Sequence, residues 1–162
     1  MIYLNKHMEK KKVIWRVGDV FAVPLMNGLS SIGQIIDLQT PNIIRCAYYS
    51  EIFSLKDFEE KSFCESANLI ALLASTREQV DFGIWKIIGK KNIDVKGFTL
   101  PNEQFRAKGW VGAKIYDAGI VEEFLNAYFG LCVWDDWADP YYLDNLLINK
   151  SKKPASLLLK KS

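Results

Sequence analysis

Histidine is almost absent from this chain of 162 residues, since His7 is the only one. It lies in a lysine-rich leader, where it is badly placed to complete a Ser-His-Asp triad or to share a metal ion with other imidazoles. The three cysteines, Cys46, Cys64 and Cys132, form no C-x-x-C pair. This favours reduced thiols in the core over a disulfide frame or a zinc site. We therefore expect no metal, no cofactor and no catalytic residues.

Long hydrophobic runs are missing too. No apolar segment approaches the ~20 residues that cross a bilayer, and Met1–Lys12 has no apolar stretch followed by a cleavage site. A soluble protein that stays in the cytoplasm is expected. The length suits one domain, which we place at residues 13–148, between a basic leader at 1–12 and a basic C-terminal tail at 149–162.

Lysine and arginine are missing between Ile115 and Asn149, a stretch that holds seven acidic side chains. Residues 13–148 contain 12 basic and 18 acidic side chains, a net charge of −6, although the whole chain carries +2. The positive charge is concentrated at the two ends. An acidic body would steer a cationic partner toward this region, whereas basic ends are most often solubilising or loosely ordered.

The first third of the chain is rich in β-branched and aromatic residues that turn signals interrupt. Val13–Leu25 predicts a strand, a tight turn and a second strand. Asn27-Gly28 is a strong hairpin signal, and Ile32–Leu38 and Ile43–Tyr49 predict two further strands. An antiparallel meander of three or four strands is expected.

Further elements follow this meander. Ser54–Asp57 resembles a capping box, which predicts a short helical turn. Ala67–Ala74 and Phe82–Ile88 are continuous apolar runs, and such runs are typical of strands buried on both faces at the centre of a sheet. Lys114–Tyr116 predicts a last strand.

Asp117 is placed to cap the main helix of the chain. The apolar residues after it recur at helical spacing, and Gly130 ends the pattern. The fold class expected is α+β: a curved, mostly antiparallel sheet, open or barrel-like, packed against one main C-terminal helix.

Motifs that carry chemistry are incomplete. Gly83 and Gly89-Lys90-Lys91 lie one residue too far apart for a phosphate loop, and a lysine replaces the hydroxyl that would hold magnesium. Gly28–Gly33 is one residue too long for a nucleophile elbow. A calcium loop that starts at Asp135 fails at three required positions. A pair of carboxylates that meet only in the fold stays open as an acid–base alternative.

The segment after the helix combines large aromatic side chains with acids. One interpretation is a loop that tryptophans pin to the core. The other is a partner-binding surface, because Trp and Tyr supply anchor area while acids match a basic protein. Both can hold at once. The partner-binding candidates are Trp134, Asp135, Asp136, Trp137, Asp139, Tyr141, Tyr142 and Asp144.

The predicted strand at Gly18–Leu25 reads G-D-V-F-A-V-P-L, and the one at Gly33–Ile36 reads G-Q-I-I. In these two motifs the N-terminal part resembles a family of bacterial immunity proteins, immunity protein 26. The resemblance extends over roughly residues 13–148 and is looser at the acidic end. It implies an antidote that binds and neutralises a cognate toxin, and it carries over no catalytic residue.

Two other functions compete with this one. The family is also associated with organophosphate hydrolysis, but a dinuclear phosphotriesterase site needs several histidines. Nucleic-acid binding through the lysine-rich ends is disfavoured because the acidic body would repel phosphates. We expect a non-enzymatic protein whose partner is a toxin with a basic surface, such as a nuclease, with no nucleic acid or membrane partner.

Overall fold

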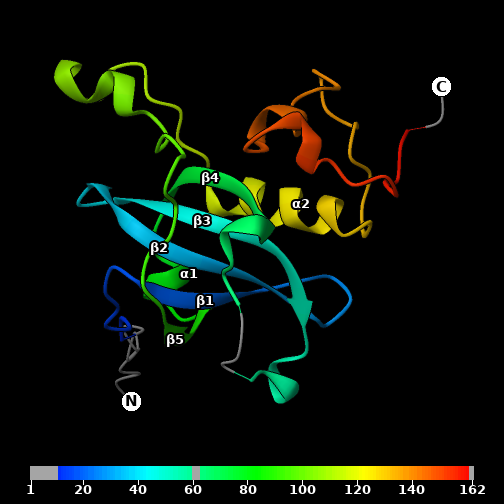
Figure 1. Ribbon diagram of the computed structural model, residues 1–162, viewed down its shortest axis with the longest axis horizontal. Helices are drawn as coiled ribbons and strands as arrows, with labels where there is room; N and C mark the ends of the chain where they lie inside the picture. Colours follow the sequence, from blue (N-terminus) through cyan, green and yellow to red (C-terminus); the bar gives the residue numbers. More distant parts are fainter. Residues whose placement is uncertain (1–10, 60–62, 161–162) are drawn as a thin grey trace, which may run out of the picture.

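The computed structural model describes residues 11–59 and 63–160, which fold around a five-stranded antiparallel sheet (Figure 1). The strand order is β4-β3-β2-β1-β5, and the sheet is open. The strands are β1 Asp19–Pro24, β2 Ser30–Thr40, β3 Ile43–Phe53, β4 Leu69–Thr76 and β5 Lys86–Lys90. The expected α+β class with an antiparallel sheet is confirmed, in its open form. Most of the predicted basic leader lies outside the described residues.

The predicted meander forms as three antiparallel strands, β1 to β3. A tight turn containing Asn27 and Gly28 joins β1 to β2, and Leu25 N donates to Leu29 O at 2.8 Å to close it. Gly28 has a φ of +81°, which glycine adopts without steric cost. The strand predicted before Gly18 is wrong. There, Trp15 instead donates its indole N–H to Asp81 Oδ1 at 2.8 Å.

The two apolar runs predicted at the centre of the sheet lie at its edges. Ala67–Ala74 contains most of β4, whereas only the last three residues of Phe82–Ile88 belong to β5, and each of these two strands pairs with one neighbour only. The central position predicted for β4 is wrong because elements on both sides of the sheet bury its two faces, so this edge strand is buried on both sides as well. Strand β5 has no buried residue, so the prediction that it is buried on both faces is also wrong. Residues 78–83 form the short helix α1 (Glu78–Asp81) and a turn. Tyr116 makes only an isolated parallel bridge, to Ser75, so the predicted last strand is wrong too.

The main helix is α2, Ala118–Tyr128, and Asp117 caps it as predicted. Asp117 Oδ1 accepts from Ile120 N at 3.0 Å. The other helical elements are 3₁₀ turns: η1 Leu55–Asp57, η2 Ser66–Asn68, η3 Glu103–Lys108, η4 Asp144–Leu146 and η5 Lys150–Lys152. The turn predicted after Ser54 is η1, but the Ser54 side chain makes no capping bond. No helix in the described part of the chain is both long and apolar enough to cross a membrane.

Each face of the sheet has its own core. On the α2 side, Phe21 of β1 stacks on the buried Trp85 with ring centroids 5.4 Å apart. A Cβ at Gly33 would come within 2.5 Å of the Phe21 ring, so this site needs glycine. On the other face, Ile32 and Tyr49 pack with Phe63.

The cysteines are unpaired, as expected. Cys46 and Cys64 are buried and Cys132 is half-buried. Burial raises the pKa of the Cys64 thiol to about 12. This thiol therefore stays protonated at neutral pH and behaves as a small apolar group.

A buried arginine holds the 99–113 loop, which contains η3, against the sheet. Arg45 of β3 is 1% exposed, and its Nε and NH2 bind the two carboxylate oxygens of Asp37 at 2.6 and 2.5 Å. Its NH1 reaches Glu103 Oε1 at 2.5 Å and Pro101 O at 3.0 Å. Every side of the guanidinium therefore has a partner, which a buried charge requires.

Hydrogen bonds from Arg106 and Arg45 hold the pKa of the Glu103 carboxyl down at about 2. Since its ordinary value is 4.5, the stabilisation from this group is present above about pH 4.5 and is lost as the pH falls toward 2.

We predict that Arg45→Met lowers the free energy of unfolding by about 2–3 kcal/mol. Removing one member of a buried ion pair costs ~3–5 kcal/mol. We expect a smaller loss here because water still reaches the Asp37 carboxylate, which is 34% exposed and stays partly solvated without Arg45. Urea denaturation measures the loss. The matched control is Arg106→Met, which removes an exposed arginine from the same Glu103 and should cost far less. Equal losses in the two variants would contradict the central role of Arg45.

Candidate functional site

The segment after α2 divides into a buried and an exposed part. Trp134 is 0% exposed, and its ring lies 5.8 Å from that of Phe124 in α2. Its indole N–H donates to Asp144 Oδ1 at 2.6 Å. The prediction that Trp134 binds a partner is wrong, because a fully buried side chain offers no surface. Asp144 serves mainly to satisfy this buried indole.

The basic C-terminal tail folds back onto the same acidic segment. Trp134 N donates to Leu158 O at 2.8 Å, and Lys160 N donates to Asp135 Oδ1 at 2.6 Å. Lys153 Nζ lies 3.0 Å from Asp144, and Lys160 Nζ lies 3.2 Å from Asp136. Residues 149–160 therefore pack on the domain, and three of the four predicted acids, Asp135, Asp136 and Asp144, bind partners in the tail.

Five of the predicted residues remain at the surface, and we call them the acidic-aromatic surface: Asp136, Trp137, Asp139, Tyr141 and Tyr142. Trp137 and Tyr142 stack with ring centroids 4.5 Å apart. Tyr141 is 66% exposed, and its backbone N–H donates to Asp139 Oδ1 at 2.9 Å. Within the described residues, the Trp137 indole nitrogen has no hydrogen-bond partner although it is buried.

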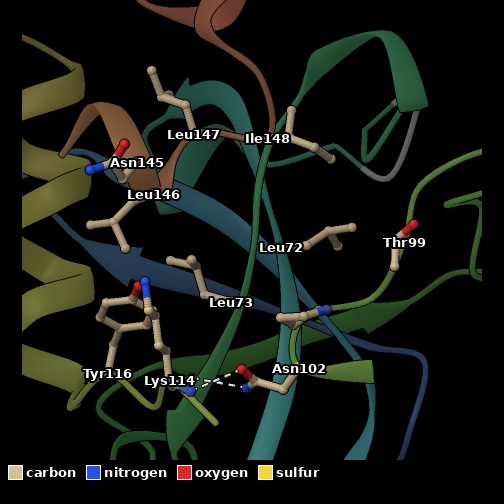
Figure 2. A pocket seen from close by; sticks show the side chains of 11 residues that line it. Leu72, Leu73, Thr99, Asn102, Lys114, Tyr116, Asn145, Leu146, Leu147 and Ile148 are labelled. Atoms are coloured by element: carbon tan, nitrogen blue, oxygen red, sulfur yellow. Dashed lines mark hydrogen bonds between the residues drawn. The ribbon is translucent and has the colours of Figure 1, made fainter. Parts of the chain in front are cut away.

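A pocket of about 240 Å³ borders this surface (Figure 2). The link between the two is Tyr116, whose ring meets that of Tyr142 edge to face at 6.5 Å. The lining comes from the middle of β4, from the ends of the 99–113 loop and from the segment that starts in η4: Leu72, Leu73, Asn102, Lys114, Tyr116 and residues 145–148.

The pocket opens over a gap in the covering of the β4 edge. Ile148 N donates to Ile70 O at 2.7 Å, and Tyr116 N donates to Ala74 O at 2.9 Å. Leu72 lies between these two contacts. Alternate residues of a strand direct their backbone groups to the same side, so Leu72 presents its N–H and C=O toward the pocket. Among the described residues, backbone hydrogen bonds cover the edge on either side of Leu72, and none of them reaches Leu72.

Asn102 fixes the rim of this pocket. It has a φ of +67°, is 7% exposed, and its amide exchanges two hydrogen bonds of 2.9 Å with the backbone of Lys114, as Figure 2 shows. Lys114 is the only charged residue among the described residues that line the pocket. The site thus combines aromatic rings, a few hydrogen-bonding groups and a small pocket, an arrangement suited to binding a partner. In the described ranges 11–59 and 63–160, no group of three or more His, Cys, Asp or Glu residues could hold a metal ion.

Comparisons with protein-family models, with curated proteins and with solved structures find no match to this chain. The resemblance to immunity protein 26 therefore stays a prediction. The case for a function depends on the chain's own residues.

Sequence reasoning missed the pocket and the position of the tail. The tail gave one usable signal, because lysines follow a stretch of seven acids that contains no lysine or arginine. The pocket gave none, since its walls come from residues 72–148 and meet only in the fold.

We predict that Trp134→Ala lowers the free energy of unfolding by about 3–5 kcal/mol, the usual cost of deleting a buried tryptophan. Trp137→Ala should cost about 1 kcal/mol, because it removes one half-exposed aromatic stack. Urea denaturation measures the free energy of unfolding of both variants. A larger loss in Trp137→Ala would contradict the assignment of Trp134 to the core and of Trp137 to the surface.

Proposed function

We propose that this protein is an antidote that binds and neutralises a cognate bacterial toxin through its acidic-aromatic surface. The observation that carries the proposal is the stacked pair of Trp137 and Tyr142 beside the exposed Tyr141, with Asp136 and Asp139 around them. Trp and Tyr are enriched among the residues that contribute most to protein–protein affinity. The strand motifs that resemble immunity protein 26 support the antidote role.

A nuclease-type effector fits this surface best. The face of a nuclease that binds nucleic acid must be positive, because phosphates dominate that interaction. Acids on the antidote complement such a face and speed the encounter. Asp117, the cap of α2, is exposed, and its charge acts on the nearby Tyr142 of the acidic-aromatic surface. A specific complex buries roughly 1,200–2,000 Å² in total, so we include Asp117 in the proposed interface.

The C-terminal tail leaves room for such a partner. The Lys160–Asp136 ion pair is 69% and 62% exposed on its two side chains. Ion pairs this exposed contribute little to stability. A cationic side chain of the toxin can therefore replace Lys160 at small cost.

We predict that Asp136→Lys lowers the association rate constant for the toxin about two- to fivefold and flattens its dependence on salt, because it weakens electrostatic steering. Surface plasmon resonance at several salt concentrations measures both. Asp94→Lys is the matched control, since Asp94 is exposed, lies outside the acidic-aromatic surface and gives the same change in net charge. Equal effects of the two substitutions would show that only net charge matters.

We predict that Tyr141→Ala weakens the complex by about 2 kcal/mol, mainly through faster dissociation. The stability of the free protein should stay unchanged, since the side chain is 66% exposed. Isothermal titration with the protein encoded beside this gene measures the affinity. An unchanged dissociation constant would place the interface elsewhere, and the absence of any saturable protein partner would contradict the antidote function itself.

A further inference from the structure

A second cavity lies at the other end of the molecule from the acidic-aromatic surface. Figure 1 shows η1 at the bottom, next to the end of β3, whereas residues 134–148 are drawn at the top right. The cavity has a volume of about 380 Å³. Three phenylalanines and three acids stand out in its lining: Glu51, Phe53, Asp57, Phe58, Glu59 and Phe63.

The three phenylalanine rings form one continuous aromatic wall. The Phe53 and Phe58 centroids lie 5.0 Å apart, and those of Phe58 and Phe63 lie 4.9 Å apart. Phe63 is 6% exposed, and Phe53 and Phe58 pack against the core of that sheet face, so the wall is anchored in the fold. The faces of such rings carry partial negative charge and attract cations.

One cation of the chain already uses this wall. Lys91 Nζ lies 5.9 Å from the centroid of the Phe63 ring and also donates to the Phe63 carbonyl oxygen. Lys91 does not line the cavity, so its ammonium group leaves the cavity side of the wall unoccupied. The contact shows that the local geometry places a positive charge against the Phe63 ring.

Three carboxylates make the lining of the cavity negatively charged. Glu51 is half-buried, and its Oε1 accepts from Cys64 N at 2.9 Å. A carboxylate has about four acceptor sites, so Glu51 retains the capacity to bind another donor. Burial raises the pKa of Glu51 above its ordinary value, and the charge of Lys91 offsets part of this shift. Asp57 and Glu59 are exposed at the rim, and the lining that the described residues provide contains no lysine or arginine.

We propose that this cavity binds the guanidinium group of an arginine side chain on a partner protein. The planar guanidinium stacks on aromatic faces, and its fork of donors matches carboxylates, whereas a lysine ammonium offers only a compact point charge. The inference rests on the proposed function in one respect, namely that the partner is a toxin with a basic surface. The inference adds a second point of contact with that partner and identifies the guanidinium as the chemical group that makes it.

The cavity can be tested without any partner. The full-length isotope-labelled protein is titrated with N-acetyl-argininamide and followed by NMR. We expect saturable shifts at Glu51, Ile52 and Phe58, with a dissociation constant on the order of millimolar for so small a ligand. The neutral isostere N-acetyl-citrullinamide should give no saturable shift there. Equal shifts with citrulline, or none with arginine, would overturn the proposal, and tighter binding of N-acetyl-trimethyllysinamide would reassign the cavity to quaternary ammonium groups.

Conservative variants separate binding from folding. Glu51→Gln keeps the oxygen that accepts from Cys64 N and removes only the charge, so we expect affinity for N-acetyl-argininamide to fall about fivefold or more. Phe58→Leu should lower it about threefold. Asp94→Asn, an exposed acid outside the cavity, should leave it unchanged. If Glu51→Gln binds as well as the parent while its spectrum shows a native fold, the cavity does not recognise charge.

The two proposals fail separately. A toxin complex whose affinity is insensitive to Glu51→Gln and Phe58→Leu overturns the arginine site and leaves the antidote function intact. A cavity that binds N-acetyl-argininamide in a protein that neutralises no toxin overturns the antidote function and leaves the site.

Discussion

The structure depends on one constraint: its sheet is apolar on both faces, so both faces must be covered. Phe21, Ile44 and Tyr48 point to one side and Ile32, Ala47 and Tyr49 to the other, all with no exposed surface. A chain with one main helix cannot cover two faces with helices. Helix α2 and the C-terminal segment cover one face, and Phe63 with the segment from Val95 to Leu100 covers the other. Burial of this apolar area is the main favourable contribution to folding.

A helix forms its own backbone hydrogen bonds, but an irregular segment needs side chains to hold it against the sheet. Buried charged and amide side chains supply these hydrogen bonds, and we call them polar anchors. Arg45 ties the 99–113 loop to β3, and Asn102 closes that loop onto Lys114. Asp144 satisfies the indole of Trp134 at the start of the C-terminal segment. Each anchor contributes stability only while all its partners are present, because a buried polar group left alone is costly.

Aromatic and acidic side chains remain at the surface where the covering of the sheet ends. The C-terminal segment buries Trp134 but leaves Trp137, Tyr141 and Tyr142 at the surface with acids around them. Among the described residues, backbone hydrogen bonds cover the β4 edge at Ile70 and Ala74, and none reaches the edge between them. The aromatic wall at the end of β3 is covered on one side by Lys91 and borders a cavity on the other. Trp137, Tyr142 and the rings of the aromatic wall pack against the core, which holds them in place at the surface.

Local signals predicted the local structure well. The Asn27-Gly28 turn, the strands around it and the helix cap at Asp117 follow from backbone chemistry within a few residues. These local signals did not predict which segments, distant in sequence, lie next to each other in the fold. The apolar run of β4 gave no indication of an edge position, because nothing in it encodes that Ile148 and Tyr116 cover the edge.

In the candidate site, too, the sequence predicted local features but not contacts between distant residues. The segment 134–144 was found from its composition, but the separation of Trp134 from Trp137 depends on Phe124 and Leu158, which are distant in sequence. The cavity with Phe53, Phe58 and Phe63 was not found, because its rings recur at every fifth residue, a spacing that matches neither the helix nor the strand period.

Hydrogen–deuterium exchange tests the central claim most directly. The protein is compared alone and in the presence of the toxin encoded beside its gene. If the acidic-aromatic surface is the interface, amides of residues 136–142 exchange more slowly in the complex, while those of the edge strand β5 do not change. Unchanged exchange at residues 136–142 in a saturated complex would contradict the account.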